Sequence, residues 1–382
     1  MGMDKNVSVI ALGDVILGDE EDYYVGAIKE TLDSYDVRIG QLEVPYTRRN
    51  PVLDGLSREP ERLEALQGHM DIMTLAGNHL YDAKEEGIED TIRKLDELKI
   101  LHTGGGSSLS EASVPAVFEK NGVKIGVLNY NCVGPNAAFA GPSKAGGNYV
   151  RVYTTYDLGD VANPGGPPEH IHTFPEAESF ERMKEEVSAL REKADVVMVY
   201  FHKGIVHKPI KLAEYEKVVS HAAIDAGADV VFSCHSHILH GNEIYKGKTI
   251  YHGLGNGIAW VPSLGPWYKF RNAKKNDVFD PEDWTRKRIE RFGFAPDPEY
   301  PTYPFHPEAI YNTFAILKIE EGKITETGVL PAIVGKDGAP RVVQRENGGE
   351  EVLAYLQKIT DGAGLNVSYN WDGDNILFAE KG

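Results

Sequence analysis

Short apolar runs of strand length alternate along the chain with segments whose apolar positions follow a helical period. Between residues 84 and 98, for example, Ile88, Ile92, Leu95 and Leu98 share one face of a predicted helix. Strands are predicted at residues 7–12, 36–42, 71–76, 195–201 and 229–233, and further helices at residues 180–193, 211–226 and 350–360. This alternation predicts an α/β fold with a sheet built from βαβ units.

Three pairs of apolar runs are separated by short polar turns and therefore predict β-hairpins. They join residues 114–119 to 123–129, 242–245 to 249–252, and 314–319 to 323–330, and a closing strand is predicted near residues 376–379. Two long stretches, residues 134–175 and 262–307, lack such a pattern. We expect one domain over residues 1–382, in which insertions at about 134–180 and 262–307 shape a substrate cleft. Plain surface excursions are the alternative interpretation.

The overall composition is that of a globular protein and narrows the choice of partner. The chain has 382 residues, of which 41% are hydrophobic and 26% charged, and its formal net charge is −18. This charge disfavours a nucleic-acid backbone or an anionic membrane as the partner. The chain has two cysteines, Cys132 and Cys234, which give no disulfide framework, and it has no apolar run of membrane-spanning length. We expect a cytoplasmic protein that acts on a small molecule, with its oligomeric state left open.

Side chains that bind metals recur where the predicted strands end. Because the carboxyl ends of strands in open α/β sheets point to one edge, these side chains are expected to converge. Carboxylate, amide and imidazole donors together suit a divalent ion, of which Mn, Fe or Zn is most expected. A single Gly-Asp turn or histidine is as often structural, so the prediction depends on the order of the whole set. Its members are Asp14, Glu43, Asn78, His202, His235 and His237.

The same segments resemble the motif series of a known family. They are Gly13-Asp14, Gln41-Leu42-Glu43-x-Pro45, Gly77-Asn78-His79-x-x-Asp82, His202-x-Gly204 and His235-Ser236-His237. In this order they are similar to the CapA (poly-γ-glutamate capsule synthesis protein) family of the calcineurin-like metallophosphoesterase superfamily. The resemblance covers roughly residues 7–258. It implies a four-layer α/β/β/α sandwich, metallophosphoesterase-like and with long insertions, whose metal centre lies at a sheet edge.

The resemblance also implies a role for each residue of the motifs. One ion would be held by Asp14, Glu43 and His237, and another by Glu43, Asn78, His202 and His235, so one or two ions are expected. His79 would take the place of the superfamily's acid or transition-state stabiliser. Asp82 would orient His79 by accepting a hydrogen bond from its ring. An equal alternative for Asp82 is a helix N-cap before residues 84–98.

The chain departs from the wider superfamily at several positions. A histidine is usual two residues after the first aspartate, where this chain has Ile16, and a further histidine is usual where Cys234 stands. The first ion would therefore lack one ligand. Lys203 and His207 near the fourth motif, and His170 and His172 in the first insertion, are weaker candidates for substrate contacts. Solvated or structural side chains are the alternative for all four.

These observations favour a metal-dependent hydrolase that uses metal-activated water. A chain with two large insertions suggests a small molecule held under a lid, and we favour hydrolysis of an amide-type C–N bond. Phosphoester hydrolysis is one alternative. A non-catalytic component of a poly-γ-glutamate-type biosynthetic complex is another, to which the departure at Ile16 gives modest support.

Overall fold

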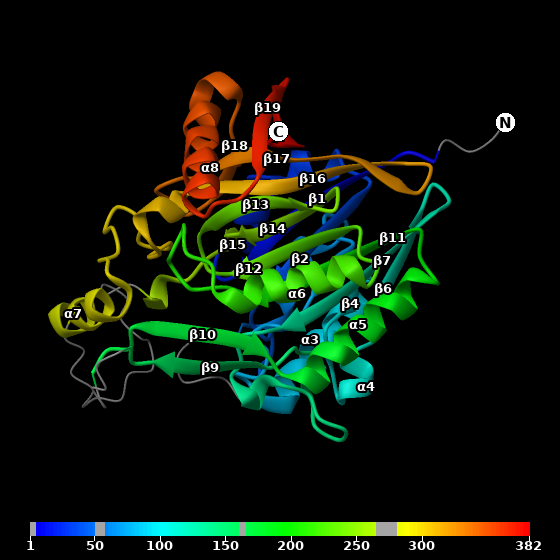
Figure 1. Ribbon diagram of the computed structural model, residues 1–382, viewed down its shortest axis with the longest axis horizontal. Coiled ribbons are helices and arrows are strands. Elements are labelled where there is room, and N and C mark those ends of the chain that lie inside the picture. The colour runs from blue at the N-terminus through cyan, green and yellow to red at the C-terminus, as the bar shows by residue number, and fades with distance from the viewer. Residues whose placement is uncertain (1–4, 50–57, 160–165, 265–280) are drawn as a thin grey trace.

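Two β-sheets lie face to face, with helices on their outer faces, in the computed structural model (Figure 1). The structure describes residues 5–49, 58–159, 166–264 and 281–382. The four-layer α/β/β/α sandwich expected from the resemblance is confirmed. Among the helices of these described ranges, none is both long enough and apolar enough to cross a membrane.

The larger sheet has ten strands in two connected halves. In one half β1, β2, β3 and β4 run parallel, and β15 also pairs in parallel with β1. The other half is antiparallel and joins the first where β16 pairs with β1. The strands are β1 (Val7–Ile16), β2 (Val37–Leu42), β3 (Ile72–Thr74), β4 (Leu101–Thr103), β15 (Asn256–Ala259), β16 (Tyr311–Glu320), β17 (Lys323–Val334), β18 (Pro340–Val342), β19 (Val367–Asp372) and β20 (Asn375–Glu380).

The smaller sheet has six strands in the order β13-β14-β12-β11-β7-β6. Its four central strands run parallel, and an antiparallel hairpin partner closes each side. The strands are β6 (Ala116–Lys120), β7 (Val123–Asn131), β11 (Val196–Lys203), β12 (Val230–His235), β13 (Leu239–Tyr245) and β14 (Lys248–Leu254). The three predicted hairpins are confirmed as β6–β7, β13–β14 and β16–β17.

The helices are divided between the two outer faces and the ends of the sandwich. α1, α2 and α3 cover the larger sheet, α5 and α6 cover the smaller one, and α8 packs beside β13 and β17. The helices are α1 (Glu21–Gly26), α2 (Lys29–Asp33), α3 (Lys84–Glu97), α4 (Leu109–Ala112), α5 (Ala177–Arg191), α6 (Glu214–Asp225), α7 (Pro281–Phe292) and α8 (Glu350–Gly362). Short helical turns occupy Pro60–Leu66, Asn136–Ala138, Pro262–Leu264, Pro307–Ile310 and Arg345–Gly349.

Three hydrophobic clusters fill the spaces between the four layers. The middle cluster joins the facing sides of the sheets, with Val9 and Ile39 of the larger sheet and Met198 of the smaller one. An outer cluster packs α3 on the larger sheet, and another packs α5 and α6 on the smaller sheet. Both sheets are therefore buried on both faces at their centres. This explains why their parallel strands appear in the sequence as continuous apolar runs and not as alternating ones.

The first insertion is more ordered than its sequence predicts. Residues 134–175, expected to be irregular, contain the antiparallel hairpin of β9 (Val152–Asp157) and β10 (His170–Pro175), and the short strand β8 (Gly146–Gly147), which pairs with β5 (Gly105–Gly106). Most side chains of β9 and β10 are exposed, so neither strand has the apolar periodicity by which a half-buried strand is predicted. In the second insertion the structure describes α7 and the residues after it, while residues 265–280 lie outside the described ranges.

The segment that follows β2 is fastened to α3 by one buried carboxylate. Asp90 accepts hydrogen bonds from Arg49 at 3.0 and 2.8 Å, from Arg93 at 2.6 Å, and from the Thr47 hydroxyl. The same segment is held again where Tyr46 N donates to the Thr91 hydroxyl at 2.8 Å. These contacts fix the path of the chain immediately after Glu43.

We expect Asp90→Asn to lower the free energy of unfolding by about 1–3 kcal/mol at pH 7, because three charge-assisted contacts weaken. Although burial opposes ionisation, Arg49, Thr47 and Arg93 lower the pKa of Asp90 below its usual value. Its stabilisation is therefore complete above the unfolded-state pKa of about 3.9 and is lost as the pH falls through the folded-state pKa. Urea unfolding from pH 7 to pH 3 measures this difference. The exposed Glu89, which also pairs with Arg49, is the control, and Glu89→Gln should cost less than about 1 kcal/mol. Equal losses in the two variants would contradict the assignment.

Candidate metal centre

The parallel strands of both sheets bring their polar ends to one edge of the sandwich. Asp14 lies in β1, Glu43 directly follows β2, and His202 and His235 lie at the ends of β11 and β12. Asp14 sits where the pairing of β1 with both neighbours shifts register. At this point the chain passes so close to Gly255 that a Cβ on Gly13 would meet the Gly255 carbonyl oxygen at 2.1 Å. Glycine is therefore required before Asp14.

Asp14, Glu43 and His237 form one group of possible ligands. His237 Nδ1 lies 3.6 Å from Asp14 Oδ2, and His237 Nε2 lies 3.4 Å from Glu43 Oε1. His237 Nδ1 is also 2.9 Å from Oδ1 of Asn256. When Nδ1 carries the proton and donates it to this amide oxygen, the lone pair of Nε2 faces Glu43.

Glu43, Asn78, His202 and His235 form a second group around one imidazole. His202 Nε2 lies 2.7 Å from Asn78 Oδ1, 3.1 Å from His235 Nδ1 and 3.9 Å from Glu43 Oε1. Glu43 belongs to two of the groups that distance defines, one with Asp14 and His237 and the other with His202 and His235.

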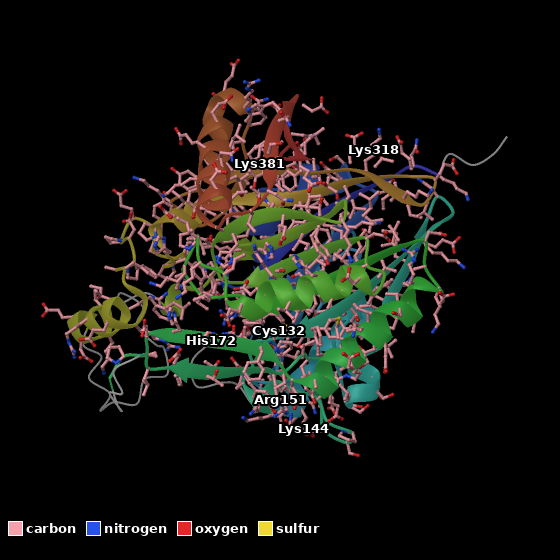
Figure 2. All side chains as sticks on the ribbon, in the orientation of Figure 1. Cys132, Lys144, Arg151, His172, Lys318 and Lys381 are labelled. Carbon is pink, nitrogen blue, oxygen red and sulfur yellow. The ribbon has the colours of Figure 1, made fainter. Side chains whose placement is uncertain are left out.

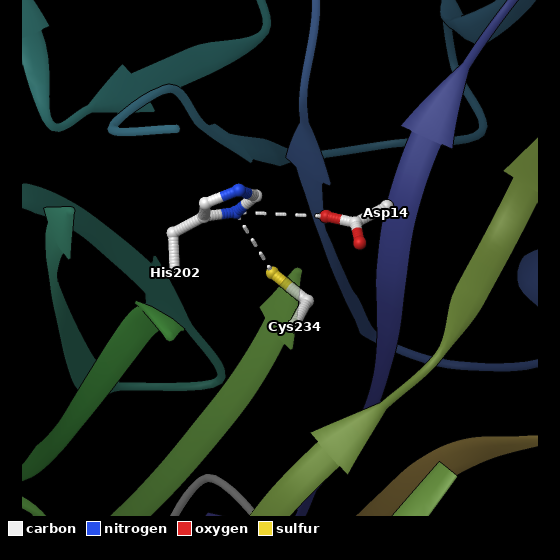
Figure 3. Close-up of side chains that lie close together, drawn as sticks. All are labelled: Asp14, His202 and Cys234. Atoms are coloured by element: carbon white, nitrogen blue, oxygen red, sulfur yellow. Dashed lines mark hydrogen bonds and ion pairs between the residues drawn. The ribbon is translucent and has the colours of Figure 1, made fainter. Parts of the chain in front are cut away.

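Cys234 adds a third possible group that the sequence prediction did not include. Its Sγ atom lies 3.6 Å from His202 Nδ1, which is itself 3.7 Å from Asp14 Oδ1 (Figure 3). Both carboxylate and sulfur thus face the ring nitrogen that points away from Asn78. The available signal was the place of Cys234 immediately before His235.

Most oxygens of the two buried carboxylates lack a hydrogen-bond partner among the described residues, and this feature of the site fits a bound cation. Asp14 and Glu43 have no exposed surface. Asp14 Oδ1 and both carboxylate oxygens of Glu43 have no hydrogen-bond partner among the described residues. Burying an ionised carboxylate without compensation costs several kcal/mol. A divalent ion between these oxygens and the neighbouring imidazoles would remove that cost, so the residues present fit a bound metal.

The pKa values of the two acids diverge. Burial, together with the nearby Glu43 carboxylate, raises the pKa of Asp14 to about 8. Burial also opposes ionisation of Glu43, but the contact with His237 and the nearby His79 and His202 lower the pKa of Glu43 to about 2. Without an added cation, one carboxylate therefore tends to hold a proton while the other is charged.

The imidazoles differ in the same way. Burial lowers the pKa of His202 to about 3 and that of His235 well below its usual value, so both are neutral at pH 7 and able to act as ligands. Burial also opposes protonation of His237, but Glu43 and Asp14 raise the pKa of His237 to about 9. The protonated His237 therefore carries a positive charge beside the carboxylates of Asp14 and Glu43.

The backbone around the second histidine motif is held in a conformation that favours glycine. His235 has φ of 105° and His237 has φ of 53°. A non-glycine residue in such a conformation costs about 1–3 kcal/mol and is typical of functional sites. The turn displays both imidazoles toward the edge shared by the two sheets.

His79 and Asp82 lie beside this centre and contact each other. His79 Nδ1 is 2.6 Å from Asp82 Oδ2. Burial opposes protonation of His79, but Asp82 and Glu43 raise its pKa above the usual value. The helix after them has Ala83 as its N-cap, without a capping side chain. The N-cap alternative for Asp82 is therefore wrong, and its carboxylate holds the His79 ring.

The four weaker candidates for substrate contacts occupy different places. Lys203 is fully buried, 3.4 Å from Glu216 Oε2 and 3.2 Å from His252 Nδ1. The expectation of a substrate contact at Lys203 is corrected, because a side chain enclosed in this way has no surface for a ligand. His207 is also buried, and its ring packs against Phe292 and Phe294 from the second insertion.

His170 and His172 lie on β10, in the exposed hairpin of the first insertion. Figure 2 labels His172 on this hairpin. His172 Nδ1 is 3.0 Å from Glu214 Oε1 at the start of α6, and His170 is largely exposed. Their neighbour Thr173 lines a cavity beside His235. Because alternate residues of a strand point to opposite faces, the two histidines face away from that cavity.

The structure adds information on two positions beside the motifs, Asn256 and Ile16. Asn256 was not among the predicted ligands, yet its Oδ1 lies 2.9 Å from His237 Nδ1, and its amide also donates to the Tyr303 hydroxyl at 2.8 Å. Ile16 packs in the outer hydrophobic cluster of the larger sheet. The position at which the wider superfamily has a histidine is thus part of the apolar core.

Comparison with known proteins places the chain in a family. The model of the family described as "Bacterial capsule synthesis protein PGA_cap" matches residues 8–260. The capsule biosynthesis protein CapA of Bacillus anthracis is 21% identical over 272 residues, which are 66% of this chain and 60% of that protein. The PGA biosynthesis protein CapA of Bacillus subtilis (strain 168) is 27% identical over 188 residues, 49% of this chain and 42% of that protein.

The chain thus spans less than two thirds of the length of both relatives. Among solved structures, the calcineurin-like phosphoesterase YfkN from Bacillus subtilis aligns with a TM-score of 0.41 and 14% sequence identity, over 94% of this chain and 98% of that chain. The family match covers more than half of this chain and spans every motif of the metal centre. The chain therefore belongs to the bacterial capsule synthesis protein PGA_cap family.

Proposed function

We propose that this protein is a metal-dependent hydrolase that cleaves an amide-type C–N bond of a small molecule at the edge shared by the two sheets. The observation that carries the proposal is the pair of fully buried carboxylates, Asp14 and Glu43, three of whose four oxygens have no hydrogen-bond partner among the described residues. The neutral imidazoles of His202 and His235 lie beside them. Such a set of donors has the composition of a catalytic divalent-metal site.

The metal would be held by the two groups of ligands already described. Asp14, Glu43 and His237 would hold one ion, and Glu43 with Asn78, His202 and His235 would hold a second. We propose Mn, Fe or Zn, as one ion or two. When bound, a divalent ion supplies Lewis acidity, which activates water and offsets negative charge at the attacked centre.

The neighbouring residues have distinct roles in this proposal. His79 donates a proton to the leaving group, since Asp82 and Glu43 favour its protonated form. Asp82 holds the ring of His79 through Nδ1, which leaves Nε2 for the substrate. Asn256 fixes the orientation of His237. Asp14 accepts the backbone N–H of His235 at 2.9 Å and so ties the histidine turn to β1.

Two other functions keep specific support. Phosphoester hydrolysis would use the same donors, because metal centres of this composition serve both kinds of bond. A non-catalytic role in polymer biosynthesis is suggested by the names of the relatives, which refer to biosynthesis and not to hydrolysis. The apolar Ile16 at a position that the superfamily uses for a ligand points the same way.

Metal analysis together with a substrate screen separates these functions. We expect the purified protein to contain Mn, Fe or Zn in stoichiometric amount and to hydrolyse members of an amide panel faster than members of a phosphoester panel. His235→Ala should lose metal and reduce turnover about a hundredfold or more, because one ligand to the reacting ion is missing. His69→Ala is the control, since the His69 ring contacts Asp33 and His69 belongs to neither group of ligands. Full turnover by metal-free protein would overturn the proposal. Metal without turnover on either panel would favour the biosynthetic role.

A further inference from the structure

A cavity of about 500 Å³ opens beside the candidate metal centre, and the described residues that line it include an arginine but no acidic side chain. It reaches His235 on one side, and its wall includes the turn at Gly204–Val206 that follows His202 and Lys203. Its size is in the range of small-molecule sites. Among the described residues that line it there is no Asp or Glu, although the chain carries 58 acidic and 40 basic residues. The one lysine or arginine in the lining is Arg151.

Much of the cavity wall is built by the first insertion. Thr154 of β9 and Thr173 of β10 pair across the hairpin and line the cavity with the same face. The hairpin is joined to α6, because Tyr215 N donates to the Thr173 hydroxyl at 3.2 Å. Figure 2 shows Arg151, immediately before β9, in this part of the molecule together with Cys132.

Aromatic rings orient the guanidinium of Arg151, and its ion pair with Glu176 is long. Its guanidinium lies over the rings of Phe139 and Tyr149, at 5.6 and 5.8 Å from their centres, and these rings stack on each other at 4.3 Å. Its Nε is buried and has no hydrogen-bond partner among the described residues. Glu176 Oε1 lies 3.7 Å away, beyond hydrogen-bond distance, and accepts a hydrogen bond from Tyr153 instead. An arginine held by aromatic rings with free donor capacity is suited to bidentate binding of an oxyanion such as a carboxylate or phosphate.

We infer that this cavity holds the substrate and that Arg151 anchors an oxyanion on it, a carboxylate or phosphate group separate from the reacting bond. The inference rests on the proposed function, because the reacting bond must lie toward His235. The substrate class is therefore a small anionic amide: one end pairs with Arg151 and the hydrolysable end lies at the metal centre. The hydroxyls of Thr154 and Thr173 supply neutral hydrogen bonds between the two ends.

The test measures binding without turnover, on protein from which metal has been removed with a chelator. Glutarate, inorganic phosphate and the neutral glutaramide are titrated by calorimetry into the wild-type protein and into Arg151→Gln, Arg151→Lys and Arg182→Gln. Arg182 is the matched control: it lies over the same Tyr149 ring at 4.6 Å and donates to the Tyr149 carbonyl oxygen, but it does not line the cavity. Thermal unfolding of each variant verifies that it is folded.

We expect Arg151→Gln to weaken binding of the preferred anion about tenfold or more, since a charge-assisted hydrogen bond is lost. Arg151→Lys should retain part of the affinity, Arg182→Gln should stay within about twofold, and glutaramide should not distinguish wild type from Arg151→Gln. Tighter binding of glutarate assigns a carboxylate, and tighter binding of phosphate assigns a phosphate group. Equal anion affinity in Arg151→Gln and wild type, or no saturable binding of either anion to wild type, would overturn the inference. Because no metal is present, either result is distinct from failure of the proposed hydrolysis.

Discussion

Replacing Glu43 with glutamine is expected to abolish metal binding and hydrolysis while leaving the protein folded. Glu43 belongs to both groups of ligands, and its two oxygens are buried without hydrogen-bond partners in the part of the chain that the structure describes. An amide of the same shape keeps the packing but removes the negative charge that holds a cation. Turnover should fall about a thousandfold or more, a loss at or above that caused by removing one donor to a developing charge.

Thermal unfolding with and without added MnCl₂ gives the readout that does not depend on activity. A ligand that binds only the folded state at about 100 times its Kd adds roughly 2.7 kcal/mol of stability. Wild type should show this gain and Glu43→Gln should not. Glu119→Gln, in the β6–β7 hairpin away from the site, is the control and should behave as wild type. A metal-dependent gain of the same size in Glu43→Gln would show that Glu43 is not a ligand.

Replacing His79 with alanine should slow hydrolysis while leaving metal content unchanged. His79 lies beside the ligands, and its ring is held by Asp82 at 2.6 Å. Loss of a positioned general acid reduces kcat about 10²–10⁴-fold. Metal analysis and steady-state kinetics on the same preparation measure both effects, and metal loss from His79→Ala would instead make His79 a ligand.

Asp82→Asn separates the two parts of this pair. An amide in place of the carboxylate should reduce kcat about tenfold through a poorly held ring, in the range of losses caused by outer-shell changes. KM and metal content should stay near wild type. If Asp82→Asn matched His79→Ala in kcat, the carboxylate itself would have to act on the substrate, and the positioning role would be wrong.

The parallel core of the fold was predictable because its strands are buried on both faces. Continuous apolar runs such as Val196–Lys203 end in polar residues at the edge where the sheets meet. Motifs that are separate along the sequence therefore lie close together in the fold. Ligand types and their placement at strand ends were visible in the sequence. The family resemblance implied their grouping around Glu43, and the fold adds the distances of 3.4 and 3.9 Å from Glu43 Oε1 to His237 and His202.

What the sequence missed depends on contacts between distant residues. The β9–β10 hairpin is held by α6 through Thr173 and Glu214, so its strands carry no apolar periodicity of their own. The charge of Lys203 suggested a substrate contact, but the side chain is fully buried and its Nζ donates to Glu216, thirteen positions later in the chain. Arg151 was not predicted as a binding residue, because an isolated arginine in a segment without periodicity carries no local signal of a ligand.

X-ray diffraction from crystals grown with manganese, measured at the manganese absorption edge, would locate the cation directly. We predict anomalous density within bonding distance of Glu43, bordered by Asp14 and His237, by Asn78, His202 and His235, or by both groups. Manganese bound elsewhere on the molecule, with this edge of the sandwich lacking anomalous density, would contradict the assignment of these residues as a metal centre.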